Sequence, residues 1–152
     1  MRMISKTPAA YAHIRGDTNH PVLNGIVRFY QFPGAILVEA DIFGLPRNST
    51  GFHGFHIHTG AACSGKDLSV TGGHFDVSGR THPMHTGDLP PLLSRNGCAY
   101  LSVLTDRFSI SEIVGRTVVI HSDADDFHTQ PAGNAGEKIA CGVISGNAKR
   151  KM

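Results

Sequence analysis

Short hydrophobic runs recur along the chain, and turn-forming residues separate them. Asn24-Gly25 precedes an apolar run at 26–30, and Pro33-Gly34 opens a second run at 35–43, so these two runs are expected to pair as a hairpin. Further strands are expected at 54–58, 98–105, 117–121 and 139–144. Only the segment 109–113 resembles a helix, and it is long enough for a single turn. Many short strands without a long 3.6-residue period predict an all-β fold, a sandwich or barrel.

Two long polar segments, at 59–95 and 122–138, interrupt this pattern of strands. Both are rich in glycine and proline, and irregular stretches of that length inside a compact domain are usually functional. Nearly all of the ten histidines lie in or beside them. We therefore expect these two loops to carry the functional site.

Length and composition indicate one folded domain. A chain of 152 residues buries roughly 70% of its unfolded surface in a single core, and no repeat or linker divides it. We expect one domain over 1–152, with its core at about 9–146 and a loose basic tail at 149–151. Charged residues make up only 17% of the chain, which excludes a highly charged disordered protein.

Charge and hydropathy name no macromolecular partner. The formal net charge of +2 is too small to indicate nucleic acid or a membrane surface, so neither is expected. Residues 1–18 lack the apolar core of a signal peptide, and no run is long enough for a membrane span. The compartment stays open between the cytoplasm and, if a leader has been removed, the periplasm or the extracellular space.

The first histidine motif lies on an expected strand. His56 and His58 are two residues apart, so both side chains project from one face, about 7 Å apart along the strand. This arrangement suits two imidazoles that bind one metal, although a solvent-facing polar strand is the alternative. His53 has the opposite parity and is interpreted as structural. His121 closes an apolar strand and is either a buried core residue or a further ligand.

The second histidine set lies in the first long loop. Three histidines and one aspartate within fifteen residues match the tetrahedral donor set that zinc takes; they are His74, His82, His85 and Asp88. A mobile histidine-rich loop is the alternative. Three cysteines, Cys63, Cys98 and Cys141, allow one disulfide at most and have no zinc-finger spacing.

Five segments of the chain resemble the signature blocks of copper/zinc superoxide dismutases, and they occur in that family's order. They are GFHIH at 54–58, GHF at 73–75, HTGDL at 85–89, GRTVVIH at 115–121 and GNAGEKIACGVI at 133–144. Five blocks in order are far more specific than a single pair of histidines. The resemblance implies an eight-stranded Greek-key β-barrel or sandwich with two long functional loops.

The resemblance also implies the role of each site residue. It implies a copper site formed by His56, His58, His74 and His121, and a zinc site formed by His74, His82, His85 and Asp88. The shared His74 is then a bridging imidazolate, which carries no proton while both metals are bound and takes one up when reduced copper releases the ring. Asp125 then hydrogen-bonds one copper-side and one zinc-side histidine. Cys63 and Cys141 occupy the positions of the family disulfide. Cys98 remains, and we interpret it as a small strand hydrophobe.

The implied activity is that of an oxidoreductase. The family converts superoxide into dioxygen and hydrogen peroxide with a redox-cycling copper next to a structural zinc. Lys138 stands where the family usually has the arginine that positions the anion, and a lysine offers a point charge instead of a planar fork. The chain also departs from the family in extra residues at 66–70, in a short stretch between His82 and His85, and in the loop at 127–132.

Two alternatives stay open at this point. The same fold and site would also suit a non-catalytic protein that binds copper and zinc or stores copper. The oligomeric state is open as well, with a homodimer as one alternative, because no interface is legible in the sequence.

Overall fold

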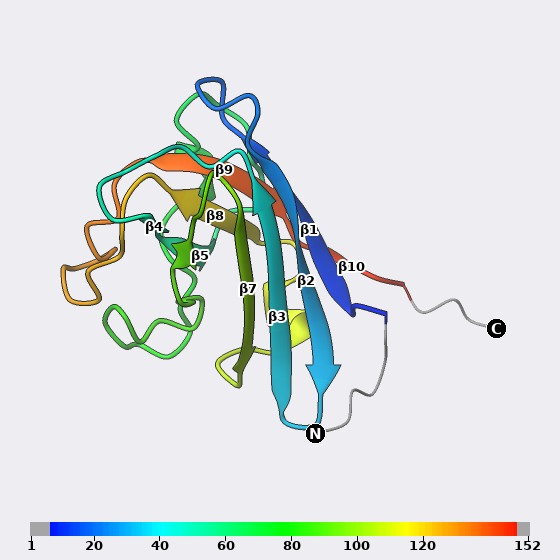
Figure 1. Ribbon diagram of the computed structural model, residues 1–152. Helices are drawn as coiled ribbons and strands as arrows, with labels where there is room; N and C mark the ends of the chain where they lie inside the picture. Colours follow the sequence, from blue (N-terminus) through cyan, green and yellow to red (C-terminus); the bar gives the residue numbers. More distant parts are fainter. Residues whose placement is uncertain (1–6, 149–152) are drawn as a thin grey trace.

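Eight antiparallel strands form one curled sheet in the computed structural model, which describes residues 7–148 (Figure 1). The predicted all-β fold is confirmed; the predicted tail at 149–151 lies outside the described residues. The strands of this sheet are β1 Ala10–Gly16, β2 Asn24–Phe32, β3 Ala35–Phe43, β5 Phe55–His58, β7 Ala99–Thr105, β8 Thr117–His121, β9 Lys138–Val143 and β10 Ser145–Gly146. Their order is β5-β8-β9-β1-β2-β3-β7, with β10 paired to β1.

The remaining elements are short. β4 (Phe52–His53) pairs with β6 (Leu92–Leu93) in a separate two-stranded sheet. A 3-10 turn covers Ser69–Thr71, and α1 is the single helical turn Ile110–Ile113 that the sequence predicts. Among residues 7–148, no helix is long and apolar enough to cross a membrane.

The β2–β3 hairpin forms as the sequence predicts. Phe32 pairs with Ala35 across the two-residue turn Pro33-Gly34. Gly34 has a φ of 69°, which glycine adopts without steric cost. Turn chemistry and strand pattern therefore agree at this hairpin.

The sequence prediction omits β1, although the strand lies at the centre of the sheet between β2 and β9. Ala10, Ala12 and Ile14 are buried and alternate with more exposed neighbours. Alanine has a low β-propensity, so the strand lacks the Val/Ile-rich run typical of a central strand. The alternation with a period of two was the signal that could have identified it.

The sheet buries residues on both faces where β5, β8 and β9 meet. Ile57, Val118 and Ile120 belong to the main hydrophobic core. In the registry between β5 and β8, His56 lies opposite Val119 and therefore shares its face. That second face is covered by the two long loops, which lie on one side of the sheet in Figure 1. Strand alternation thus directs Ile57 into the core and its histidine neighbours toward the loops.

A disulfide joins the first long loop to β9. Cys63 and Cys141 are bonded, with their Cα atoms 5.7 Å apart, so the pairing implied by the resemblance is present. Cys141, Leu68 and Val119 form a small second apolar cluster around it. The bridge therefore lies on the same face of the sheet as the histidines.

Cys98 differs from its prediction. Its side chain is exposed and its thiol is free, so the interpretation as a small strand hydrophobe is wrong. β7 begins one residue later, at Ala99, which is buried. Cys98 instead lies in the turn before β7, where its backbone pairs with that of Arg95.

Candidate metal centre

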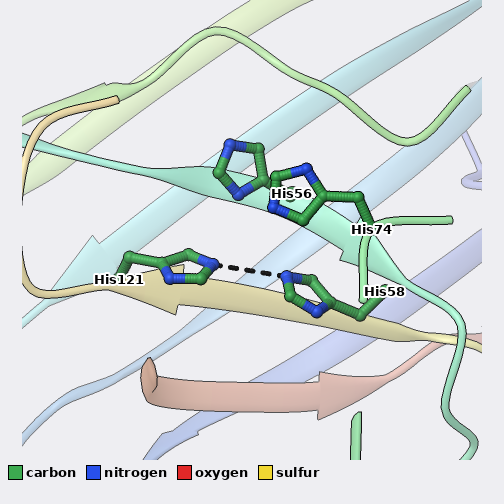
Figure 2. Close-up of side chains that lie close together, drawn as sticks. All are labelled: His56, His58, His74 and His121. Carbon is green, nitrogen blue, oxygen red and sulfur yellow. Dashed lines mark hydrogen bonds between the residues drawn. The ribbon is translucent and has the colours of Figure 1, made fainter. Parts of the chain in front are cut away.

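Four histidines from three parts of the chain converge on the outer face of β5 and β8 (Figure 2). His56 and His58 come from β5, and His121 ends β8. His74 comes from the first long loop, where its backbone pairs with that of His58. One ring nitrogen from each of the four histidines lies within 4.8 Å of those of the others. The structure therefore brings together all four residues predicted for the copper site.

Hydrogen bonds to backbone carbonyls orient two of these rings. Nδ1 of His58 lies 2.8 Å from the carbonyl oxygen of Gly72, and Nδ1 of His121 lies 3.4 Å from that of Gly136. Because a carbonyl only accepts, each Nδ1 must carry the hydrogen. The two Nε2 atoms then present lone pairs to each other across 3.3 Å. Facing lone pairs at this distance repel unless a cation lies between them, so this geometry fits a metal ion.

The other two rings have buried nitrogen atoms without a hydrogen-bond partner among the described residues. They are Nδ1 of His56 and Nε2 of His74. A buried polar atom without a partner costs free energy, and both of these atoms belong to rings of the same four-histidine group, so they fit a metal site. Together with the Nε2 atoms of His58 and His121, these atoms form a four-nitrogen set, and imidazole suits copper.

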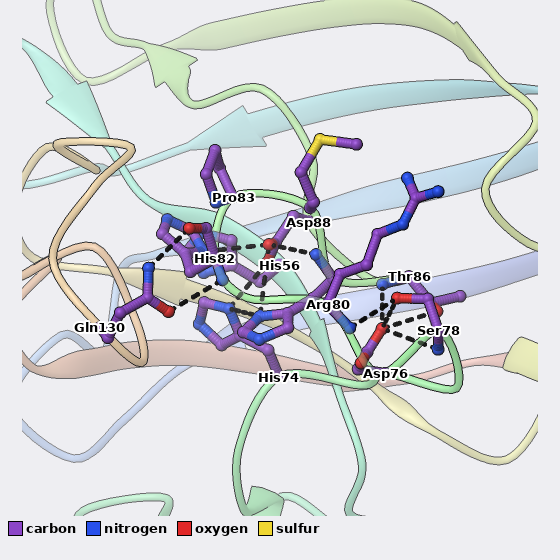
Figure 3. Close-up of polar contacts among 12 residues, drawn as sticks. His56, His74, Asp76, Ser78, Arg80, His82, Pro83, Thr86, Asp88 and Gln130 are labelled. Carbon is purple, nitrogen blue, oxygen red and sulfur yellow. Dashed lines mark hydrogen bonds and ion pairs between the residues drawn. The ribbon is translucent and has the colours of Figure 1, made fainter.

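The predicted zinc residues also lie together, and His74 belongs to both groups. Nδ1 of His74 is 2.7 Å from one carboxylate oxygen of Asp88, while Nδ1 of His82 is 3.0 Å from the other. Nδ1 of His85 lies 3.3 Å from Asp88 and 3.4 Å from Nδ1 of His74. Three imidazole nitrogens and one carboxylate oxygen fit the tetrahedral donor set of zinc. Most of this group is visible in Figure 3.

Asp125 connects the two groups by a hydrogen bond to one histidine of each. Its carboxylate accepts a hydrogen bond of 2.7 Å from Nε2 of His56 and another of 2.7 Å from Nε2 of His82. Burial acts to raise the pKa of Asp125, but these two hydrogen bonds, together with one from the Phe127 N–H, outweigh burial and hold the pKa below its usual range. The carboxylate stays ionised, so both rings keep their Nδ1 atoms free of hydrogen.

Gly133 allows this close arrangement. A Cβ at this position would collide with Oδ1 of Asp125 and Nε2 of His82. Gly133 also has a φ of 70°, which disfavours other residues. The glycine that begins the block at 133–144 therefore leaves space for the bridge formed by Asp125.

Burial keeps two of the copper-side imidazoles neutral, those of His58 and His121. It lowers the pKa of His58 to about 2, with a further contribution from the nearby His121. It also lowers the pKa of His121 to about 3, with a further contribution from His56. Neutral rings have a lone pair available, so they can bind a metal ion at neutral pH without first losing a proton.

Lys138 begins β9 next to this group. Its ammonium donates hydrogen bonds to Oγ1 of Thr71 at 2.9 Å and to the carbonyl oxygen of Gly72 at 2.8 Å. The same carbonyl accepts the hydrogen bond from His58. The positive charge is therefore one peptide group away from a predicted copper ligand.

Two residues outside the predicted set support the site. Nδ1 of the fully buried His53 lies 2.9 Å from the carbonyl oxygen of His121, in keeping with its structural interpretation. Gln130 spans the second long loop to the first: its Nε2 donates to the carbonyl of His82 at 2.7 Å, and its Oε1 accepts from the His82 N–H at 2.9 Å (Figure 3). A glutamine in a polar loop gives no sequence signal for such a contact.

A β fold that holds a four-histidine group beside a three-histidine, one-aspartate group, with one histidine in common, defines a protein that binds two neighbouring metal ions. The chain matches the family model for copper/zinc superoxide dismutase over residues 23–144. It therefore belongs to the copper/zinc superoxide dismutase family, and the resemblance identified from the sequence is confirmed.

Individual relatives agree with this assignment. The chain is 36% identical over 132 residues to a Cu-Zn superoxide dismutase of Legionella pneumophila, a match that covers 82% of this chain and 79% of that protein. It is also 36% identical over 152 residues to Cu-Zn superoxide dismutase 3 of Arabidopsis thaliana, covering 89% of this chain and 88% of the relative. A Cu-Zn superoxide dismutase of Deinococcus radiodurans is 34% identical over 143 residues, covering 80% of this chain and 77% of the relative.

Proposed function

We propose that this protein converts two superoxide anions and two protons into dioxygen and hydrogen peroxide. Membership of the family supports this activity and the predicted class, an oxidoreductase that uses copper and zinc. The observation that carries the proposal is the position of His74, whose ring belongs to both groups of metal-binding side chains. A protein that only stored copper would not require one imidazole to connect two different donor sets.

The proposal assigns each group to one metal. Copper is held by His56, His58, His74 and His121, and zinc is held by His74, His82, His85 and Asp88. When bound, copper supplies one-electron redox chemistry, and zinc, which has none, fixes the loop.

His74 has a second role in the proposal, as the proton carrier. Its Nδ1 faces Asp88, whereas its buried Nε2 has no partner among the described residues. Nε2, which would bind copper, is therefore also the atom that would hold a proton whenever the ring is not bound to that metal, and that would pass the proton to the product. The hydrogen bonds from His56 and His82 to Asp125 keep the neighbouring rings fixed while this happens.

Lys138 attracts and orients the substrate in this proposal. Superoxide is a small anion, and one positive charge near the site raises its local concentration. Thr71 and the Gly72 carbonyl hold the ammonium in place. The charge therefore acts at a fixed position next to the copper group.

Substitution of Lys138 is expected to change turnover according to charge and geometry. Lys138→Ala should lower turnover severalfold, and Lys138→Glu should lower it further, because a negative charge repels superoxide. Lys138→Arg should match or exceed the parent, because its planar fork orients an anion better than a point charge. Stopped-flow decay of superoxide over a range of ionic strengths checks these values, and salt should slow the parent more than Lys138→Ala.

The control for this series is Arg47→Ala, which removes an exposed positive charge outside the two long loops. All variants must contain the same amounts of copper and zinc. Equal turnover and equal salt dependence across the series would show that Lys138 has no part in catalysis.

The proposal treats the chain as a single domain whose substrate is the superoxide anion. It involves no nucleic acid and no membrane. Both a monomer and a homodimer are compatible with it, and sedimentation velocity distinguishes the two.

A further inference from the structure

Arg107 reaches from the connection between β7 and α1 to the turn that carries two of the zinc residues. Nη1 of its guanidinium lies 2.8 Å from the carbonyl oxygen of Pro83, 3.3 Å from that of Asp88 and 3.5 Å from that of His85. Nη2 lies 3.5 Å from the sulfur of Met84. One side chain therefore contacts four residues of the turn at 83–88.

These contacts are concentrated on one side of the turn. Three backbone carbonyls point toward Arg107, and two of them belong to His85 and Asp88 themselves. A guanidinium is a planar cation with five donors, so it can neutralise several converging carbonyl dipoles at once. All three carbonyls face the one nitrogen Nη1, which lies one bond farther from Cα than a lysine ammonium and two bonds farther than a glutamine amide, so neither replacement reaches the same position.

Other side chains hold the rest of the loop. Gln130 binds the backbone of His82, and the carboxylate of Asp76 accepts hydrogen bonds from the backbone and hydroxyl of Thr86. Neither contact reaches the carbonyls of His85 and Asp88. The turn itself places one backbone hydrogen bond between the two ligands, from the Asp88 N–H to the His85 carbonyl at 3.2 Å, and the Asp88 backbone pairs with that of His56. Arg107 adds the contacts that reach both carbonyls from outside the turn.

We propose that Arg107 is a positioning residue that holds His85 and Asp88 in zinc-binding geometry. This inference rests on the proposed zinc assignment. By fixing the backbone on which both ligands are carried, Arg107 lowers the cost of ordering them when zinc binds. Partners of this kind typically contribute roughly 10- to 100-fold to metal affinity.

The test compares Arg107→Gln with Arg80→Gln. Arg80 lies in the same loop, two residues before His82. Its side chain is exposed and makes no hydrogen bond to another residue between 7 and 148; only its backbone N–H does. Both substitutions remove one positive charge near the zinc group, but only Arg107→Gln removes the contacts with the turn. Zinc affinity is measured by competition with a chromophoric chelator while copper content is followed in the same samples.

Arg107→Gln is expected to weaken zinc binding by about 10- to 100-fold, with copper retained and Arg80→Gln close to the parent. Cobalt bound in place of zinc should also show a changed visible spectrum in Arg107→Gln, because its ligand geometry is altered. Arg107→Lys, which keeps the charge but ends one bond short of the position of Nη1, should lie between the parent and Arg107→Gln. If Arg107→Gln does not fold, the zinc affinity of Arg107→Lys relative to the parent tests the inference instead.

Three results would overturn the inference: unchanged zinc affinity and cobalt spectrum in Arg107→Gln, an equal loss in Arg80→Gln, or Arg107→Lys indistinguishable from the parent. Failure of the zinc assignment has a different signature. In that case the parent itself would not bind one zinc per chain, whatever residue stands at 107.

Discussion

Alanine at His82 is expected to release zinc while copper stays bound, and alanine at His58 is expected to do the reverse. His82 belongs to the zinc group and His58 to the copper group, whereas His74 is shared between them. The loss of a ligand should lower the affinity for the affected metal by more than the roughly 10- to 100-fold loss that is typical when a hydrogen-bond partner of a ligand is removed. His58→Ala should also abolish superoxide turnover. Elemental analysis after dialysis against a weak chelator measures both metals in each variant.

His128→Ala is the matched control for this pair. His128 is an exposed histidine of the second long loop and lies outside both the copper group and the zinc group. It should keep both metals and full turnover. If His82→Ala lost copper and kept zinc, the assignment of the two sites would be wrong.

Removal of the Cys63–Cys141 bridge is expected to lower the free energy of unfolding by roughly 4 kcal/mol. The bridge joins residues 78 positions apart, so its loss releases much conformational freedom in the unfolded chain. Urea unfolding of the metal-depleted protein measures the difference between the parent and Cys63→Ser or Cys141→Ser. The metal-loaded variants should also lose zinc more readily, because the first long loop is no longer tied to β9.

Cys98→Ser is the control for this experiment, because Cys98 is free and exposed. Its unfolding free energy should equal that of the parent. Peptide mapping that found Cys98 in the bridge, or an equal loss of stability in all three variants, would contradict the expected pairing.

The sequence predicts those elements whose determinants are local. Pro33-Gly34 defines the hairpin of β2 and β3 because turn chemistry and strand alternation lie within a few residues of each other. Asn24-Gly25, expected to precede the strand, instead begins β2 and pairs with Phe43 and Ile42. β1 is missed because alanines fill its core positions. Cys98 is misread because the apolar character of cysteine was given more weight than strand alternation, which places position 98 on the same exposed side as Tyr100 and Ser102.

For the metal site, too, the sequence identifies the residues whose pattern is local and misses those that are distant in the chain. The pair His56 and His58 and the set between His74 and Asp88 stand out by spacing, but spacing does not show that they meet. The family resemblance supplies that relation. Gln130 and Arg107 contact the zinc loop from positions 48 and 24 residues away from their partners His82 and Pro83. Only the folded chain brings these residues together with the zinc loop, and no local sequence pattern around a glutamine or an arginine predicts such a contact.

The measurement that tests the central claim most directly is superoxide turnover by protein whose copper and zinc content has been determined. With one copper and one zinc per chain, the protein should remove superoxide catalytically and form one hydrogen peroxide for every two superoxide anions consumed. Protein that holds zinc alone should be inactive, and activity should return in proportion to added copper. A chain that binds both metals at full occupancy and yet leaves superoxide to decay at its spontaneous rate would contradict the account and identify a metal-binding protein without this activity.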